Sequence, residues 1–405
     1  MAHAVSRRRW AVAALLFLAT MLNYLDRQVL SVTAPVLRQT FGMTAQQYSG
    51  VVFAFLLAYT LGQSLAGRFM DAVGTRRGMG MAMLWWSAAG ALHAAASSLG
   101  QLSVFRFLLG IGEAGNWPGA VKTVQQWFPP RERAFAMGVF NSGSAIGAVA
   151  APPLIAFLTL RYSWRWAFLL TGALGLLWVL PWLAVNRTPV AAEKGRAVLR
   201  PHWRELLRDP RVQGLMLARF FCDPVWWFYV FWLPDYLSRA RGFSLAMIGL
   251  FAWVPFLAAD LGNLAGGWAS GRLVRAGFEA TRARKSVMGA SAAAMALGVI
   301  AAYMPDAAGA IAVVSAVTFG YSAWAANVLT LPADLFGRER VGAATGLTGT
   351  AAGVGGMLNT VAVGWLVDHW SYKPAFAVAT VLPLAAFAAL ALLVRPAARI
   401  EENTL

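Results

Sequence analysis

Long apolar runs alternate with short polar segments along the whole chain. Each of the twelve runs is near the length of about 20 residues that a helix needs to cross the hydrocarbon core of a bilayer. The runs cover residues 10–32, 49–67, 79–99, 102–123, 135–158, 165–185, 211–236, 246–270, 286–304, 308–331, 342–366 and 374–394. This pattern predicts an all-α integral membrane protein with twelve transmembrane helices.

The longest polar connection divides the runs into two sets of six. It covers residues 186–210 and carries six Lys or Arg side chains. We therefore expect an N-terminal six-helix bundle over 1–185, a linker over 186–210 and a C-terminal six-helix bundle over 211–405.

Two sequence landmarks recur at nearly the same spacing. The segment that begins Gly67-Arg68 after the second run has a counterpart at Gly271-Arg272 after the eighth, an offset of 204 residues. Arg131-Glu132-Arg133 has a counterpart at Arg338-Glu339-Arg340, an offset of 207 residues. A repeat of this length indicates an internal duplication, which predicts that the two bundles are pseudo-symmetric.

The composition agrees with a membrane location, since 59% of the 405 residues are hydrophobic and 13% are charged. Of the 34 Lys and Arg residues, 24 fall on the side of the N-terminus if alternate connections face alternate sides. This asymmetry predicts a multi-pass protein of the bacterial inner membrane with both termini in the cytoplasm. The net charge of +17 therefore reflects topology in the lipid bilayer, and we expect no nucleic-acid partner.

The sequence offers little for a metal or cofactor site. The one cysteine, Cys222, lies inside an apolar run, so neither an intramolecular disulfide nor a thiolate cluster can form. We expect no metal, no cofactor and no enzymatic activity.

The first apolar run contains the least expected residues, Asp26 and Arg27. A charge at the centre of a membrane helix costs about 2.5–3.5 kcal/mol on insertion scales, so it needs a partner or a watery cavity. The two side chains are therefore candidates for function. The alternative is a local ion pair that only helps the first helix to pack.

Several motifs resemble a known family. The pattern Gly-x-x-x-Asp-x-x-Gly-x-Arg-Arg at 67–77 is similar to the loop signature of the major facilitator superfamily. The segments 23–27, 106–118 and 127–133 resemble the anion:cation symporter family within it, most closely hexuronate (galacturonate and glucuronate) transporters, then galactonate and glucarate transporters. The resemblance implies the major facilitator fold and an organic carboxylate that is moved with protons. The second half departs from the loop pattern, with Arg275 where the first half has Asp71.

Helix geometry predicts where the buried charges lie. Arg27 is about 25 Å from the start of the first helix, and Glu113 lies about 10 Å deeper than Arg106 on the fourth, at 1.5 Å per residue. We therefore expect Asp26, Arg27, Arg106 and Glu113 to face one cavity. The resemblance implies proton coupling at Asp26 and Glu113 and carboxylate recognition at Arg27. The alternative is a permanent structural pair of Arg106 and Glu113.

Other polar side chains inside the runs are candidates for contact with a sugar acid, although each could equally bond a neighbouring helix. The complete predicted substrate-binding set is Tyr24, Arg27, Tyr59, Arg106, Asn141, Ser322, Trp324 and Asn359. A cytoplasmic gate is predicted at Asp71, Arg76, Arg77 and Arg133. Arg219 and Asp223, one turn apart on the seventh helix, are interpreted as a self-contained pair.

Together with what the resemblance implies, these observations predict a proton-coupled symporter that imports a sugar acid, in the first place a hexuronate on that resemblance, by alternating access as a monomer. Two alternatives stay open, a transporter of another organic anion and an exporter of such anions. A membrane enzyme is less consistent with the sequence, which contains no phosphate-binding Gly-rich loop with Lys, no His-Glu-x-x-His and no Ser elbow.

Overall fold

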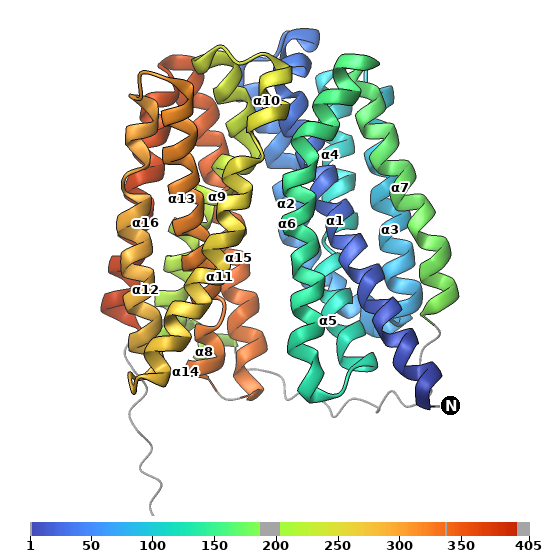
Figure 1. Ribbon diagram of the computed structural model, residues 1–405, viewed down its shortest axis with the longest axis vertical. Coiled ribbons are helices and arrows are strands. Elements are labelled where there is room, and N and C mark those ends of the chain that lie inside the picture. Colours follow the sequence, from blue (N-terminus) through green and yellow to red (C-terminus); the bar gives the residue numbers. More distant parts are fainter. Residues whose placement is uncertain (1, 187–202, 337, 395–405) are drawn as a thin grey trace, which may run out of the picture.

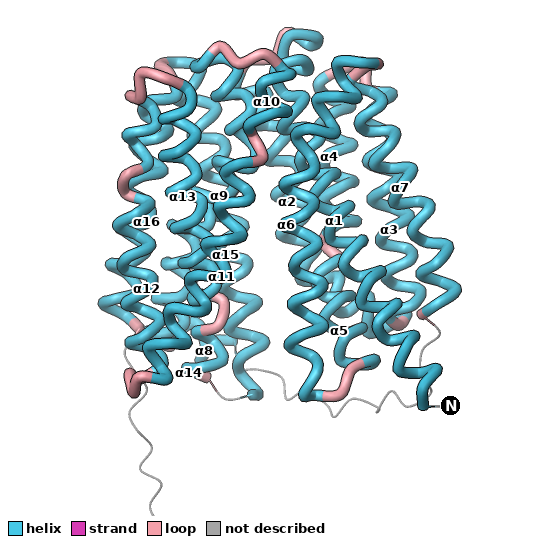
Figure 2. The backbone as a smooth tube through the Cα atoms, viewed as in Figure 1, coloured by secondary structure: helices cyan, strands magenta, loops and turns pink. Residues whose placement is uncertain are grey.

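The computed structural model describes residues 2–186, 203–336 and 338–394, and nearly all of them are helical (Figure 1). No strand occurs among the residues described (Figure 2). The predicted linker lies mostly outside this part of the chain, so its boundaries stay a prediction.

The first half forms seven α-helices and one short 3₁₀ turn. They are α1 (Ala2–Phe41), α2 (Ala45–Val73), α3 (Thr75–Leu92), η1 (His93–Ala95), α4 (Leu99–Glu113), α5 (Asn116–Trp127), α6 (Pro130–Arg161) and α7 (Trp164–Val185). Helices α4 and α5 together form the fourth predicted span, which is interrupted after Glu113.

The second half repeats this order with more interruptions. Its elements are α8 (Trp203–Arg208), α9 (Pro210–Arg241), α10 (Leu245–Phe251), α11 (Val254–Arg275), α12 (Ala280–Met295), η2 (Gly298–Ala302), α13 (Ala307–Val328), α14 (Leu331–Leu335), α15 (Arg338–His369) and α16 (Tyr372–Leu393). Joined across their breaks, the elements of both halves coincide with the twelve predicted spans.

By length and composition alone, seven of the described helices could cross a membrane, or eight if the bent helix α2 is counted. The remaining spans are broken into shorter helices or carry polar side chains. Helix α1, for example, contains Asp26 and Arg27, and α4 is only 15 residues long. The spans that fall short are therefore largely those that carry the candidate chemistry.

The packing of the helices repeats between the halves. In the first half α1 packs on α6, α2 on α4 and α3 on α7; in the second, α9 packs on α15, α11 on α13 and α12 on α16. Between the halves α2 packs on α15, α6 on α10 and α11, and α1 on α9. This pairing is what a twofold duplication produces, and it supports the internal repeat seen in the sequence.

Large aromatic side chains fill the interior of each half. Trp86 and Trp182 in the first half, and Trp232 and Trp324 in the second, are fully buried. Because dispersion and close fit hold membrane helices together where water is absent, these residues and the intervening glycines fix the helix positions.

Gly110 allows the closest approach of α4 to α2. A Cβ atom at this position would lie 2.5 Å from the carbonyl oxygen of Phe55, so only glycine fits. This contact fixes the last turn of α4, and thus Glu113, against the wall formed by α1 and α2.

The two halves meet at the end of the molecule away from the N-terminus, which we call the closed end, and separate at the end near it, the open end (Figure 1). At the closed end Arg38 donates to Asp235 at 2.5 Å, and Tyr372 also donates to Asp235. Asp368 accepts the backbone N–H groups of Ala45 and Gln46 at 2.7 and 2.6 Å. We call these side chains, Arg38, Asp235, Asp368 and Tyr372, the closed-end latch.

Candidate substrate cavity

A cavity of about 780 Å³ lies between the two halves, and its lining reaches Asp71 and Lys122 at the open end. Its volume falls within the range of small-molecule sites. Residues of α1, α2, α5, α9, α13 and α15 line it, among them Tyr24, Arg27, Tyr59, Thr60, Gln63, Asp71, Trp117, Lys122, Gln125, Arg219, Asp223, Trp226, Trp227, Tyr321, Thr345 and Thr350.

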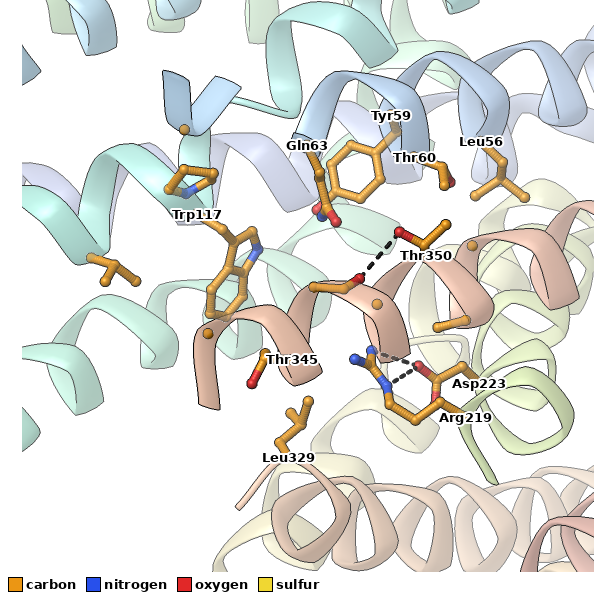
Figure 3. Close-up of a pocket in the computed structure, with 18 of the residues that line it drawn as sticks. Leu56, Tyr59, Thr60, Gln63, Trp117, Arg219, Asp223, Leu329, Thr345 and Thr350 are labelled. Atoms are coloured by element: carbon orange, nitrogen blue, oxygen red, sulfur yellow. Dashed lines mark hydrogen bonds and ion pairs between the residues drawn. The ribbon is translucent and has the colours of Figure 1, made fainter. Parts of the chain in front are cut away.

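One face of α2 forms a continuous part of the wall. Leu56, Tyr59, Thr60, Gln63 and Gly67 line the cavity, and their spacing of three or four residues is that of a single helix face. Figure 3 shows Tyr59, Thr60 and Gln63 along this face. Of these residues on α2, only Tyr59 belonged to the predicted substrate-binding set. Helical spacing from Leu56 would also have predicted Thr60 and Gln63.

Arg27 is the buried cation of the cavity wall. Its side chain is 2% exposed, and its Nε atom donates to Oε2 of Glu113 at 2.7 Å. The Nη2 atom of Arg27 and the Oε1 atom of Glu113 have no hydrogen-bond partner among the described residues. Arg27 is therefore held in place by one carboxylate oxygen while part of its guanidinium is left for another acceptor.

Four aromatic rings surround this guanidinium. The Cζ atom of Arg27 lies 4.5 Å from the ring centroid of Tyr59, 5.3 Å from Tyr24, 5.5 Å from Phe55 and 5.8 Å from Trp227. Cation–π attraction of this kind is worth about 0.5–2 kcal/mol per favourable pair. The rings also displace water, which strengthens any ion pair that Arg27 makes.

Asp26 and Arg106 lie behind the wall. Both are buried, and neither lines the cavity. The carboxylate of Asp26 is near α3, where a Cβ atom on Gly90 would lie 3.7 Å from Oδ1. The expectation that all four charges face one cavity is therefore wrong, since of the four only Arg27 lines it. Asp26 is the neighbour of Arg27 on α1, and adjacent residues on a helix point about 100° apart.

Arg106 is not paired with Glu113. All three of its guanidinium nitrogens lack a hydrogen-bond partner among the described residues, and its Cζ atom lies 5.8 Å from the ring of Phe55. Glu113 bonds Arg27 instead, so the alternative of a permanent Arg106–Glu113 pair does not agree with the geometry. Arg106 therefore lies behind the wall without a hydrogen-bonded carboxylate partner among the described residues.

The C-terminal half contributes a second charged pair to the wall. Nε and Nη2 of Arg219 both donate to Oδ2 of Asp223, at 3.1 and 2.8 Å (Figure 3). Beside the pair, Trp226 is stacked on Tyr321 with ring centroids 5.4 Å apart. The spacing of Arg219 and Asp223 predicted the pair, but not its position on the cavity wall.

Four other predicted contacts lie outside the cavity lining in this conformation, namely Asn141, Ser322, Trp324 and Asn359. Trp324 is fully buried in the helix packing of the second half. Asn359 donates to the carbonyl oxygen of Pro224 at 3.4 Å, which is the interhelical alternative considered for such residues. From α13 it is Tyr321, adjacent to Ser322, that reaches the cavity.

The predicted gate residues lie at the open end and are separated here. Asp71 pairs with Lys122 of the same half, and Arg76 donates to the carbonyl oxygen of Leu183 at 2.7 Å. Arg133 donates to backbone oxygens of its own half, while Arg77 is exposed. A latch between Asp71, Arg76, Arg77 and Arg133 stays a prediction for the state in which this end closes.

Within the part of the chain that the structure describes, no cluster of His, Cys, Asp or Glu could hold a metal ion. Cys222 is buried and unpaired with another cysteine. The described residues that line the cavity offer guanidinium, ammonium, carboxylate, hydroxyl, amide and aromatic groups.

Comparison with known proteins identifies the fold family. A sequence model of the Major Facilitator Superfamily matches residues 16–358 and 276–404. The chain belongs to this superfamily. It is therefore an integral membrane transporter and not an enzyme.

Individual relatives agree with this assignment. The chain is 33% identical to the hexuronate transporter of Escherichia coli (strain K12) over 395 residues, which are 93% of this chain and 91% of that protein. It is 37% identical to the galacturonate transporter of Dickeya chrysanthemi over 64% of this chain and 81% of that protein. The fold resembles the crystal structure of a bacterial homolog to the human lysosomal transporter Spinster, with a TM-score of 0.73 and 20% identity over 96% and 95% of the two chains.

Proposed function

We propose that this chain is a proton-coupled symporter that imports a sugar acid, in the first place a hexuronate such as galacturonate or glucuronate. The observation that carries the proposal is a buried guanidinium, Arg27, on a cavity wall and held by one oxygen of Glu113. The names of the hexuronate and galacturonate transporters among the relatives support the substrate class.

The polar groups near Arg27 suit such a substrate. A guanidinium donates two parallel hydrogen bonds to a carboxylate, in a geometry that a lysine ammonium cannot match. Tyr24, Tyr59 and Gln63 line the cavity with phenol and amide groups that bond sugar hydroxyls. The aromatic rings around Arg27 exclude water, which favours an anion over a neutral sugar.

The charges around Arg27 provide a route to proton coupling. Arg27 and Arg106 carry two positive charges, and Glu113 and Asp26 carry two negative charges when both are ionised. A monoanionic substrate adds a further negative charge in a region of low dielectric, where an unbalanced charge is costly. A proton on Glu113 would restore the balance and release Nε of Arg27 for the substrate.

This scheme assigns different roles to the two carboxylates. Glu113 contacts Arg27 directly, so its protonation changes what Arg27 can bind. Asp26 points toward α3, away from the cavity, and would act through its charge alone. We therefore assign direct coupling to Glu113 and a supporting role to Asp26.

The orientation follows from the distribution of Lys and Arg. The side of the N-terminus carries 24 of the 34 Lys and Arg residues, so the open end would face the cytoplasm of a bacterial inner membrane. Substrate would enter when the closed-end latch opens and leave toward the open end after Glu113 loses its proton. One chain forms the whole cavity, which agrees with function as a monomer.

The test is uptake of labelled galacturonate into liposomes that contain the purified protein. An inward proton gradient should drive accumulation, a protonophore should abolish it, and neutral galactose should not compete. The Glu113→Gln variant should still exchange galacturonate across the membrane but should no longer respond to the gradient. Glu205→Gln, which removes a carboxylate from an exposed pair with Arg340, serves as the control.

Two results would contradict the proposal. Uptake by the unaltered protein that does not respond to the proton gradient would contradict proton coupling. Competition by neutral galactose as strong as that by unlabelled galacturonate would contradict recognition of the anion. If uptake by Glu113→Gln responded to the proton gradient as strongly as uptake by the unaltered protein, Glu113 would not be the coupling residue.

A further inference from the structure

The Arg219–Asp223 pair lies on the cavity wall without a role in carboxylate binding or proton coupling. Its side chains are 16% and 9% exposed, and both bonds from Arg219 end on the same oxygen, Oδ2. Among the described residues, Oδ1 of Asp223 and Nη1 of Arg219 make no further hydrogen bond. A pair that served only to hold helix α9 together would not need to lie beside a cavity.

The pair belongs to a continuous stripe on α9. Arg219, Asp223, Trp226 and Trp227 all line the cavity, at the spacing i, i+4, i+7 and i+8 of one helix face. Trp226 is stacked on Tyr321 of α13, so the two rings present a broad apolar surface next to the carboxylate. A carboxylate beside an aromatic surface can receive two hydroxyls of a sugar while a ring packs against its C–H groups.

The stripe also lies at a suitable distance from Arg27. The ring of Trp227 is 5.8 Å from Cζ of Arg27. Asp223 precedes Trp227 by four residues, a rise of about 6 Å along the helix. Asp223 therefore lies about one helical turn along α9 from the residue that approaches Arg27, an offset comparable to the length of a six-carbon sugar acid.

We propose that Asp223, with the apolar surface of Trp226 and Tyr321, is a hydroxyl-binding subsite for the end of the substrate that is remote from its carboxylate. Arg219 is a positioning residue, which holds Asp223 by Oδ2 and leaves Oδ1 to accept hydrogen bonds. The subsite selects acids that carry several hydroxyls over short carboxylates that would satisfy Arg27 alone. This inference rests on the proposed function and refines its substrate class.

The test is binding of two acids to the purified full-length protein by isothermal titration calorimetry. Galacturonate carries hydroxyls that could reach Asp223, whereas glycolate is too short to span from Arg27 to it. We expect Asp223→Asn to weaken galacturonate binding at least tenfold and to change glycolate binding less than twofold. Arg219→Lys should weaken galacturonate binding by a smaller factor in the same selective way.

Asp209→Asn is the matched control, because Asp209, the N-cap residue of the same helix, forms an Arg–Asp pair with Arg211 but does not line the cavity. It should leave both affinities unchanged. Deoxygenated analogues of galacturonate, tested on the unaltered protein, provide a measurement that does not depend on the folding of any variant. Loss of at least one hydroxyl distant from the carboxylate should weaken binding about tenfold.

The outcomes separate the two proposals. Failure of the unaltered protein to bind galacturonate would contradict the proposed function itself. Normal galacturonate binding that Asp223→Asn and every deoxygenated analogue leave within twofold would overturn the subsite alone. Equal losses for both acids in Asp223→Asn would show that the pair is purely structural and would also overturn it.

Discussion

The closed-end latch makes a quantitative prediction about alternating access. Asp235 is fully buried and accepts hydrogen bonds from Arg38, at 2.5 Å, and from Tyr372. Arg38 is on α1 and Asp235 on α9, so this contact joins the two halves and must break when the closed end opens. Substitution of Asp235 by Asn keeps the shape of the side chain and removes its charge.

The size of the effect follows from the bond between Arg38 and Asp235, because Asp235 and Tyr372 both belong to the second half and their bond need not break when the closed end opens. A hydrogen bond to a charged group contributes about 1.5–3 kcal/mol, whereas a neutral one contributes about 0.5–1.5 kcal/mol. Asp235→Asn should therefore destabilise the closed end by about 1 kcal/mol. Since about 1.4 kcal/mol corresponds to a factor of ten, the fraction of molecules with this end open should rise about fivefold.

The assay is the rate at which a maleimide modifies a cysteine placed at Ser49. Ser49 is 1% exposed and faces Gly364 of the other half, where a Cβ atom would lie 2.5 Å from its Oγ atom. A cysteine there should react only when the closed end opens, so its rate follows the open fraction. The background carries Cys222→Ala, because Cys222 is the one native cysteine.

Asp209→Asn, which alters a pair remote from the closed end, should leave the modification rate unchanged. A rate in Asp235→Asn within about twofold of the parent would refute the reasoning that the latch controls this end.

Three further predictions follow from the same contacts. Arg27→Lys keeps the charge but loses the planar fork, so galacturonate binding measured by calorimetry should weaken at least tenfold; an unchanged affinity would argue against bidentate recognition. Gly110→Ala places a Cβ atom 2.5 Å from the Phe55 carbonyl oxygen and should destabilise the protein by about 1–3 kcal/mol in a thermal unfolding assay, where an unaltered midpoint would contradict the close contact of α2 and α4. At the outer end of α15, partial burial acts to raise the pKa of Asp368, but the backbone N–H groups of Gln46 and Ala45 outweigh it, so this pKa lies below its ordinary value. The carboxylate therefore stabilises the closed end above the ordinary pKa of about 3.9 and loses this effect as the pH falls through the lowered value. The difference in thermal midpoint between the unaltered protein and Asp368→Asn should be constant from pH 8 to pH 5 and should disappear in more acidic solution; a difference that already disappears by pH 6 would contradict the assignment.

Hydrophobic length and charge punctuation were sufficient to predict the twelve spans and their helical class. The interruptions inside spans were harder to foresee, because they depend on tertiary contacts. The fourth span, for example, is broken between Glu113 and Asn116, where buried polar side chains meet α1. A membrane helix tolerates such a break only where neighbouring helices or a cavity satisfy the freed backbone groups.

The site residues that carry a charge inside a membrane span could be predicted from the sequence, whereas the uncharged ones were harder to predict. Arg27 and Glu113 are costly inside a membrane unless paired, and the structure pairs them. The direction of Asp26 could not be deduced from its neighbour Arg27, because adjacent residues on a helix face different partners. Trp324 and Asn359 are residue types that can either pack against a neighbouring helix or line a cavity. The rotation of each helix about its axis decides between these two positions, and the sequence does not give that rotation.

The central claim, that a proton on Glu113 accompanies binding of an anion at Arg27, is tested most directly by counting protons during binding. Calorimetric titration of the purified protein with galacturonate, in buffers that differ in ionisation enthalpy, gives the number of protons taken up. The account predicts an uptake that approaches one proton per galacturonate, at any pH at which Glu113 is ionised in the substrate-free protein. It predicts no uptake for Glu113→Gln. Binding of galacturonate with no proton uptake at any pH from 6 to 9 would contradict it.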